Sequence, residues 1–234
     1  MSFQIRDIVL YSLTGEIRTV TLELGRVNII TGASKSGKTA LIDVIDFCLG
    51  GDDCHVAQGP MRRAVSWYGL RLQLDVGQLF IARRVPKPAE KTTSEVYLEF
   101  GSDIAIPAFD ALKSNTNFSA YKQALGKAAG IVETLAEPPE GSTQQPLAAT
   151  IRHTLYYCFQ PQYVINTPKT LFYKQDEDFI PQSIRLTLPY FLGAVSDDHV
   201  AKQNEYRRLS SELRLNKARL AEAEALRGDG SETA

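Results

Sequence analysis

The residues best suited to chemistry lie in one stretch, Gly32-Ala33-Ser34-Lys35-Ser36-Gly37-Lys38-Thr39, which matches the pattern G-x-x-x-x-G-K-[S/T]. This Walker A pattern is typical of a phosphate-binding loop. Gly32 and Gly37 let consecutive backbone N–H groups approach phosphate oxygens without a Cβ in the way. The stretch therefore predicts a nucleotide-binding site.

Each side chain of the loop has an expected role. Lys38 should reach the β- and γ-phosphates, and the Thr39 hydroxyl should coordinate Mg²⁺. Lys35 is a second cation, which we expect to be solvated rather than catalytic. We expect ATP and Mg²⁺ as cofactors, and as cofactor-binding residues Gly32, Ala33, Ser34, Lys35, Ser36, Gly37, Lys38, Thr39 and Ala40.

The elements around the loop must position it. Arg26–Thr31 is a short β-branched run that predicts a buried strand ending at Gly32. Lys38–Leu49 carries apolar residues at helical spacing, so a helix should begin at the loop and add its N-terminal dipole to the phosphate site. Two alternating runs, Gln4–Leu10 and Ile17–Leu24, predict a hairpin before it.

The middle of the chain alternates between strand and helix patterns. Three antiparallel strands are expected within about 64–106, then a helix over Phe118–Ile131 and a mobile loop over 136–147, which is rich in Pro, Gly, Ser and Gln. Ala148–Phe159 fits a helix or a strand, and Ser183–Val195 fits a short helix bent by Pro189.

The last part of the chain predicts a long helix, because Val200–Arg227 contains neither Gly nor Pro. Apolar or amide side chains recur there at three- and four-residue steps, at Tyr206, Leu209, Leu213, Asn216, Leu220 and Ala223. This spacing predicts the start of a coiled coil over 196–227, followed by a disordered tail over 228–234. A single amphipathic helix packed on the domain is the alternative.

The overall composition indicates a globular protein. The chain has 234 residues, 44% hydrophobic and 23% charged, which excludes wholesale disorder. Its net charge of −1 argues against binding nucleic acid by bulk charge. No apolar run has the length of a membrane span, and the first residues do not form a signal peptide, so we expect a cytoplasmic protein without membrane contact.

The cysteines are a further candidate site. Cys48 and the pair Cys54-His55 could be taken for a metal cluster, but reduced, packed thiols are the preferred interpretation of three dispersed cysteines.

The stretch from Ile5 to Gly51 resembles the N-terminal lobe of SMC-type ABC ATPase heads, found in chromosome-maintenance proteins and in related recombination and break-repair enzymes. Those heads open with a β-hairpin, a strand ending in the phosphate loop, and a helix that ends in an aliphatic-Leu-Gly step. Ile42, Ile45, Phe47, Leu49 and Gly50 match that helix. The resemblance is closest to a poorly characterised bacterial group of SMC-like ATPases, and it extends more loosely over Leu155–Leu220.

The resemblance implies an α/β fold of the P-loop NTPase class: an N-terminal head lobe over 1–195, with an antiparallel β-subdomain and the start of a coiled coil. It also implies a Q-loop glutamine that joins the Mg²⁺ shell and orients water. The segment Tyr156–Gln162 looks like such a Q-loop, an apolar strand ending in glutamine. Gln160 is the choice over Gln162, so Lys38 and Gln160 are the expected catalytic residues and Thr39 and Gln160 the metal ligands. A glutamine that merely caps a helix at a turn is the alternative.

The chain departs from the family pattern in three ways. Ser34-Lys35 stands where SMC heads usually have Asn-Gly, and a Leu-Ser-Gly-Gly-type signature is lacking. A Walker B strand is lacking as well; Leu70–Asp75 is the nearest match, but its alternation indicates a half-exposed strand. These departures predict half of a head, whose signature motif comes from a second lobe or from a homodimer partner.

The resulting expectation is an ATP-binding half-head that dimerises on ATP. It would hydrolyse ATP only with a C-terminal lobe, in DNA maintenance, repair or anti-phage defence, together with further subunits of a multi-component system; the chain alone should be inactive. The alternatives are an independent P-loop kinase or GTPase and a non-catalytic nucleotide-dependent scaffold. DNA is a further candidate partner for basic groups such as Arg62-Arg63 and Arg83-Arg84, although a solvated surface is the preferred interpretation of each.

Overall fold

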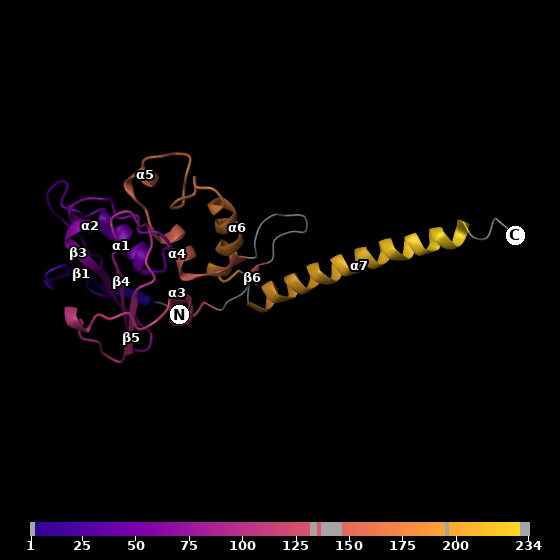
Figure 1. Ribbon diagram of the computed structural model, residues 1–234. Helices are drawn as coiled ribbons and strands as arrows, with labels where there is room; N and C mark the ends of the chain where they lie inside the picture. Colours follow the sequence, from indigo (N-terminus) through magenta and orange to yellow (C-terminus); the bar gives the residue numbers. More distant parts are fainter. Residues whose placement is uncertain (1–2, 132–134, 137–146, 195–196, 230–234) are drawn as a thin grey trace. The chain divides into compact units, whose positions relative to one another are not determined.

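The computed structural model describes residues 3–131, 135–136, 147–194 and 197–229 (Figure 1). They belong to two compact units. The first unit combines Met1–Val132 with Thr150–Pro181, and the second combines Glu133–Ala149 with Gln182–Ala234. The phosphate loop and Gln160 both belong to the first unit.

A five-stranded antiparallel sheet forms the centre of the first unit, with the order β2-β1-β3-β4-β5. Its strands are β1 (Phe3–Ser12), β2 (Ile17–Thr21), β3 (Val65–Leu74), β4 (Gln78–Arg84) and β5 (Val96–Gly101). The predicted hairpin is confirmed as β1 and β2, and the three later strands are confirmed as β3 to β5. Because β3 pairs with β1, the strands within 64–106 extend the sheet of the hairpin.

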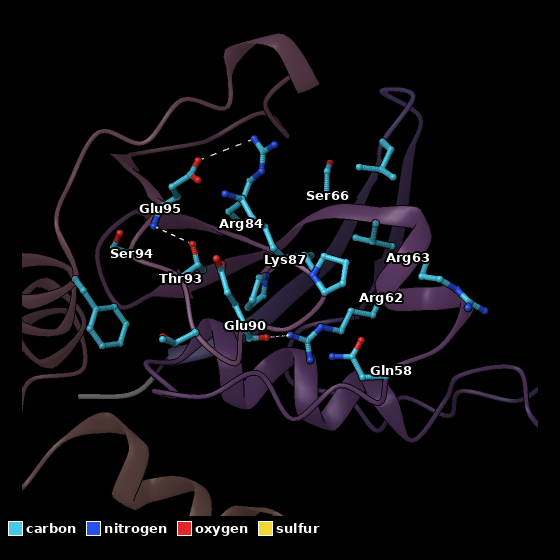
Figure 2. A pocket seen from close by; sticks show the side chains of 17 residues that line it. Gln58, Arg62, Arg63, Ser66, Arg84, Lys87, Glu90, Thr93, Ser94 and Glu95 are labelled. Carbon is cyan, nitrogen blue, oxygen red and sulfur yellow. Dashed lines mark hydrogen bonds and ion pairs between the residues drawn. The ribbon is translucent and has the colours of Figure 1, made fainter.

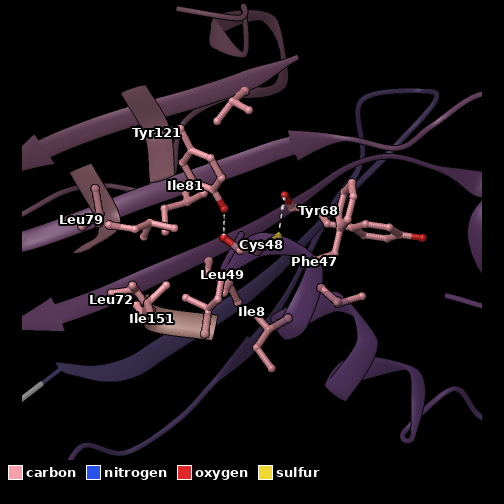
Figure 3. Close-up of a cluster of buried hydrophobic side chains, with 14 of the residues drawn as sticks. Ile8, Phe47, Cys48, Leu49, Tyr68, Leu72, Leu79, Ile81, Tyr121 and Ile151 are labelled. Atoms are coloured by element: carbon pink, nitrogen blue, oxygen red, sulfur yellow. Dashed lines mark hydrogen bonds between the residues drawn. The ribbon is translucent and has the colours of Figure 1, made fainter. Parts of the chain in front are cut away.

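Both faces of the sheet carry buried side chains, because successive residues of a strand point to opposite faces and both sets are apolar in β1, β3 and β4. One face carries Ile8, Leu70, Leu72 and Ile81, and packs against the helix that follows the phosphate loop (Figure 3). The opposite face carries Val9, Tyr11, Trp67, Phe80 and Ala82, and is covered by Ile104 and Leu112. A fold of mixed α/β class is therefore confirmed.

The helices of the first unit are α1 (Ala40–Cys48), α2 (Pro60–Ala64), α3 (Phe118–Ala128), α4 (Ile151–Cys158) and α5 (Gln162–Ile165), with a short 3-10 turn, η1 (Phe109–Ala111). The helices predicted after the loop and over Phe118–Ile131 are confirmed as α1 and α3. Asn117 caps α3, since its side-chain oxygen accepts the N–H of Ala120 at 2.8 Å.

Two predictions about the flanks of the site are wrong. Arg26–Thr31 forms no strand, and Val27 and Ile29 are 90% and 82% exposed, whereas a buried strand was expected. Of the two structures predicted for Ala148–Phe159, the helix is confirmed as α4, and the apolar strand expected to end at Gln160 is wrong. The start of α4 is fixed by a capping box, in which Thr150 and His153 bind each other's backbone N–H groups.

The second unit contains β6 (Leu135–Ala136), β7 (Leu147–Ala148), α6 (Ile180–Phe191) and α7 (Asp197–Asp229). The predicted helix containing Pro189 is confirmed as α6, and the predicted long helix as α7. The predicted mobile loop lies largely outside the described residues, as do residues 230–234 of the predicted tail. The start of that tail was wrong, because α7 continues through Gly228 to Asp229.

The heptad positions of α7 are open to solvent. Tyr206, Leu209, Leu213 and Leu220 are between 50% and 72% exposed. Nothing in the described part of the chain covers this apolar row, so the coiled coil stays a prediction that needs a second helix.

Candidate nucleotide site

The phosphate loop wraps around the ammonium group of Lys38. Lys38 Nζ donates hydrogen bonds to the carbonyl oxygens of Gly32 at 2.8 Å and Ala33 at 2.6 Å, and to Ser36 Oγ at 3.1 Å. The turn needs a left-handed backbone at Gly37, with φ +87°, and at Lys35, with φ +63°. The ammonium therefore lies at the centre of the loop, close to where a phosphate would meet it.

Helix α1 begins directly after the loop, as the motif requires. Thr39 is its N-cap residue, but its hydroxyl makes no capping hydrogen bond. The first turn is closed by backbone bonds from Ala40 N to Gly37 O and from Leu41 N to Lys38 O. The Thr39 hydroxyl is thus not committed to the helix end and is exposed beside Lys38.

The far end of α1 is held by two buried side chains. Arg83 is fully buried and donates to the carbonyl oxygens of Phe47, at 2.6 Å, and Gly51. Its guanidinium also lies 3.7 Å from the centroid of the Phe47 ring. The Tyr121 hydroxyl donates to the carbonyl oxygen of Cys48. These contacts fix the helix that carries Thr39 to the sheet.

A hollow of about 920 Å³ brings the loop and the predicted Q-loop together. Lys38, Thr39 and Gln160 all line it, although Gln160 lies far along the chain. The complete lining is Ile30, Lys38, Thr39, Ile42, Asp43, His55, Gln160, Pro161, Gln162, Tyr163, Asn166, Tyr173 and Lys174. Both glutamines that the sequence offered, Gln160 and Gln162, therefore lie at the same hollow.

Gln160 is exposed and follows the end of α4. Its amide Nε2 donates to the carbonyl oxygen of Leu171 at 3.2 Å. The same turn is closed by Gln175, whose side-chain oxygen accepts from the N–H groups of Leu171 and Phe172. Since the amide nitrogen binds this turn, the side-chain oxygen is the atom through which Gln160 could reach a metal.

Two acidic residues of α1 belong to the site and were missed at the sequence level. Asp43 lies one helical turn after Thr39 and lines the hollow. Burial raises the pKa of its carboxyl group, and His55 and Lys174 oppose that shift. Asp46 is 2% exposed and pairs with Lys174 and Arg152. Helical spacing from Thr39 was the signal that could have found Asp43.

The cysteines lie in the core and on the surface. Cys48 and Cys54 are buried, and burial raises the pKa of the Cys48 thiol to about 12. Cys158 is exposed. In the described ranges, no three His, Cys, Asp or Glu side chains are grouped so that they could hold a metal ion. The interpretation as packed thiols is confirmed for Cys48 and Cys54.

The basic residues of β4 and α2 surround a second hollow, shown in Figure 2, also of about 920 Å³. Arg62 is buried and donates to the carbonyl oxygens of Cys54 and Glu90, so it serves the packing of the loops. Arg84 is exposed and lies 4.0 Å from Glu95. One arginine of each basic pair is therefore structural. Arg62 and Arg83 are buried, whereas Arg63 and Arg84 face solvent.

No protein-family model matches this chain, and no curated protein sequence matches it. Across the residues that the structure describes, no helix combines the length and the apolar character that crossing a bilayer requires.

Proposed function

We propose that the chain is the ATP-binding lobe of an SMC-like ABC-type ATPase head of the P-loop NTPase class. The observation that carries the proposal is the hollow shared by Lys38, Thr39 and Gln160. A phosphate loop with a glutamine at its open side is the arrangement expected for an ATPase that responds to the terminal phosphate and its metal. The rest of the proposal follows from the chemistry of these three side chains.

In this proposal the loop and Lys38 bind the phosphates. The ammonium must exchange the carbonyl oxygens of Gly32 and Ala33 for phosphate oxygens, a gain because the phosphate oxygens carry negative charge and the carbonyl oxygens do not. The N-terminus of α1 adds its free N–H groups and its dipole. Lys38 thus supplies the charge, and the loop backbone supplies the geometry.

The oxygen atoms at the hollow suit Mg²⁺, which prefers oxygen ligands and keeps several waters. Thr39 has an uncommitted hydroxyl, Gln160 has a free amide oxygen to offer, and Asp43 adds a carboxylate nearby. Bound Mg²⁺ would neutralise phosphate charge. Thr39 and Gln160 would hold it, and Gln160 would also orient a water molecule near the terminal phosphate.

Hydrolysis needs groups that this sequence does not supply. The nearest match to a Walker B strand, Leu70–Asp75, belongs to β3 in its first five residues, and none of its residues lines the hollow. The exposed apolar side chains of Val27 and Ile29 also lack cover from the described residues. Both features support a second lobe, which would pair with Arg26–Thr31 and bring the missing acidic and signature residues. DNA-linked work, in maintenance, repair or defence, is the context in which we propose the assembled head acts.

Isothermal titration with MgATP tests the proposal. The wild-type chain should bind, and Lys38→Ala should weaken binding by about 100-fold or more, since a charge-assisted phosphate contact is lost from a loop that keeps its backbone. Lys169→Ala is the matched control, because Lys169 is exposed and does not line the hollow. Equal affinities of wild type and Lys38→Ala would overturn the proposal. ATP turnover by this chain at ordinary ATPase rates would favour a kinase or GTPase instead.

A further inference from the structure

A second lysine lies in the hollow, and the motif does not account for it. Lys174 is 8% exposed and lines the same hollow as Lys38 and Gln160. Lysine is rarely buried to this degree without a specific partner, because burying an ammonium group is costly. Its burial at this hollow therefore requires a specific partner.

The backbone at Lys174 is held in an unfavourable conformation. Its φ is +58°, in the left-handed region that is unfavourable for a residue with a Cβ. The neighbouring chain fixes it there: Tyr173 N donates to Tyr156 O at 3.1 Å, and Glu177 N donates to Lys174 O at 3.0 Å. Such local strain is often retained at functional sites. The side chain of the residue held in this way is 8% exposed and lines the hollow.

The partner of Lys174 is a carboxylate that it shares with another cation. Lys174 Nζ lies 3.4 Å from Asp46 Oδ2, and Arg152 Nε lies 3.5 Å from Asp46 Oδ1. Arg152 in turn lies 3.2 Å from Asp52. Because Arg152 stays beside Asp46, the buried carboxylate would remain compensated if Lys174 moved away. The ammonium group of Lys174 can therefore leave Asp46 without leaving that carboxylate unpaired.

The turn that carries Lys174 is also the turn that binds Gln160. Gln160 Nε2 donates to Leu171 O at 3.2 Å, three residues before Lys174. A ligand that moves Gln160 therefore acts on the same turn. Lys174 and Gln160 both line the hollow, so this turn brings the two side chains to the same site as Lys38.

We propose that Lys174 is a second phosphate-binding residue of the nucleotide site, held on Asp46 in the empty site and transferred to the terminal phosphate when ATP binds. This inference rests on the proposed function, because it needs ATP in the hollow. The Lys174 ammonium exchanges the Asp46 carboxylate for the terminal phosphate, and no covalent bond is made or broken. Lys174 then distinguishes ATP from ADP, since only ATP places a phosphate on the Gln160 side.

The test compares affinities for MgATP and MgADP by isothermal titration. Lys174→Met should weaken ATP binding by about 10-fold and ADP binding by less than about 3-fold, because only the contact to the terminal phosphate is lost. Lys174→Arg should restore most of the preference for ATP. Lys169→Met, at an exposed lysine outside the hollow, should change neither affinity.

Substitution of Asp46, the ion-pair partner of Lys174, should change the ATP affinity in the opposite direction. Asp46→Asn keeps the side-chain shape but removes the charge that holds Lys174 back, so ATP affinity should rise several-fold. If Lys174 only neutralised Asp46, this variant would leave ATP affinity unchanged or lower it. Because Asp46→Asn leaves Lys174 in place, it also decides the question if Lys174→Met does not fold.

The outcomes separate the inference from the proposed function. ATP binding that requires Lys38 but is indifferent to Lys174 and Asp46 would overturn the inference alone. Equal losses of ATP and ADP affinity in Lys174→Met would overturn it as well. A wild-type chain that binds no ATP would overturn the proposed function and the inference together.

Discussion

His153 makes the stability of α4, the helix that ends just before Gln160, depend on pH. Burial lowers the pKa of His153 to about 4; a backbone hydrogen bond with Thr150 opposes this shift, and the neighbouring Arg152 adds to it. The buried ring is therefore neutral, which lets its Nδ1 accept the backbone N–H of Thr150 at 2.9 Å. Protonation of Nδ1 would abolish that hydrogen bond. Lowering the pH should therefore destabilise the first turn of α4.

The size of the effect follows from the difference in pKa. A histidine with an unfolded pKa of 6.5 and a folded pKa of about 4 binds fewer protons when folded, so its stability contribution is present above 6.5 and is lost as the pH falls toward 4. The full shift corresponds to about 3 kcal/mol, of which about 2 kcal/mol should be lost between pH 7 and pH 5. Below pH 4 the loss from this group should stop.

The matched variant is His153→Gln. A glutamine at this position of a capping box can accept the same Thr150 N–H through its side-chain oxygen, but it does not titrate. Urea unfolding at pH 7 and pH 5 should show that the variant loses about 2 kcal/mol less than wild type. Because other groups titrate in both proteins, the difference between them isolates His153. Parallel losses in the two proteins would refute the assignment of His153 as a buried neutral residue.

Two further variants test the site and its support. Gln160→Ala should leave the ATP affinity within about 3-fold of wild type but depress turnover in an assembly that hydrolyses ATP, because the amide acts on metal and water rather than on the anchoring phosphates; isothermal titration and steady-state kinetics check this, and an equal loss of both would make Gln160 a structural residue. Arg83→Met should lower the free energy of unfolding by about 3 kcal/mol or more, since it removes a buried guanidinium that donates to the carbonyl oxygens of Phe47 and Gly51, whereas Arg84→Met, at an exposed ion pair, should cost less than about 1 kcal/mol. Urea denaturation distinguishes them, and equal losses would contradict the role given to Arg83.

The parts of the fold that the sequence predicted are those with regular local patterns. The alternation of apolar residues predicted β3 and β4, and helical spacing predicted α1 and α3. Each pattern lies within one segment of the sequence. It can therefore be recognised without knowing which other segment packs against it. The Walker A pattern over Gly32–Thr39 is likewise a local motif, and phosphate binding by it stays a prediction.

The wrong predictions concern features that depend on distant residues. Arg26–Thr31 has the composition of a strand, but a strand needs a neighbour to pair with, and none is present among the described residues. The aromatic run before Gln160 looked like a strand because histidine at the third helical position is not a usual capping signal. Lys174 could not have been found, because its partner Asp46 lies 128 residues away in sequence.

The most direct test of the central claim is a crystal structure of the chain with Mg²⁺ and a non-hydrolysable ATP analogue. We expect Lys38 Nζ to leave the carbonyl oxygens of Gly32 and Ala33 and to contact the β- and γ-phosphates. The Thr39 hydroxyl and the side-chain oxygen of Gln160 should lie in the metal shell. A nucleotide bound elsewhere, or a triphosphate in the loop with Gln160 still on Leu171 and away from the metal, would show that the proposed ATP site is wrong.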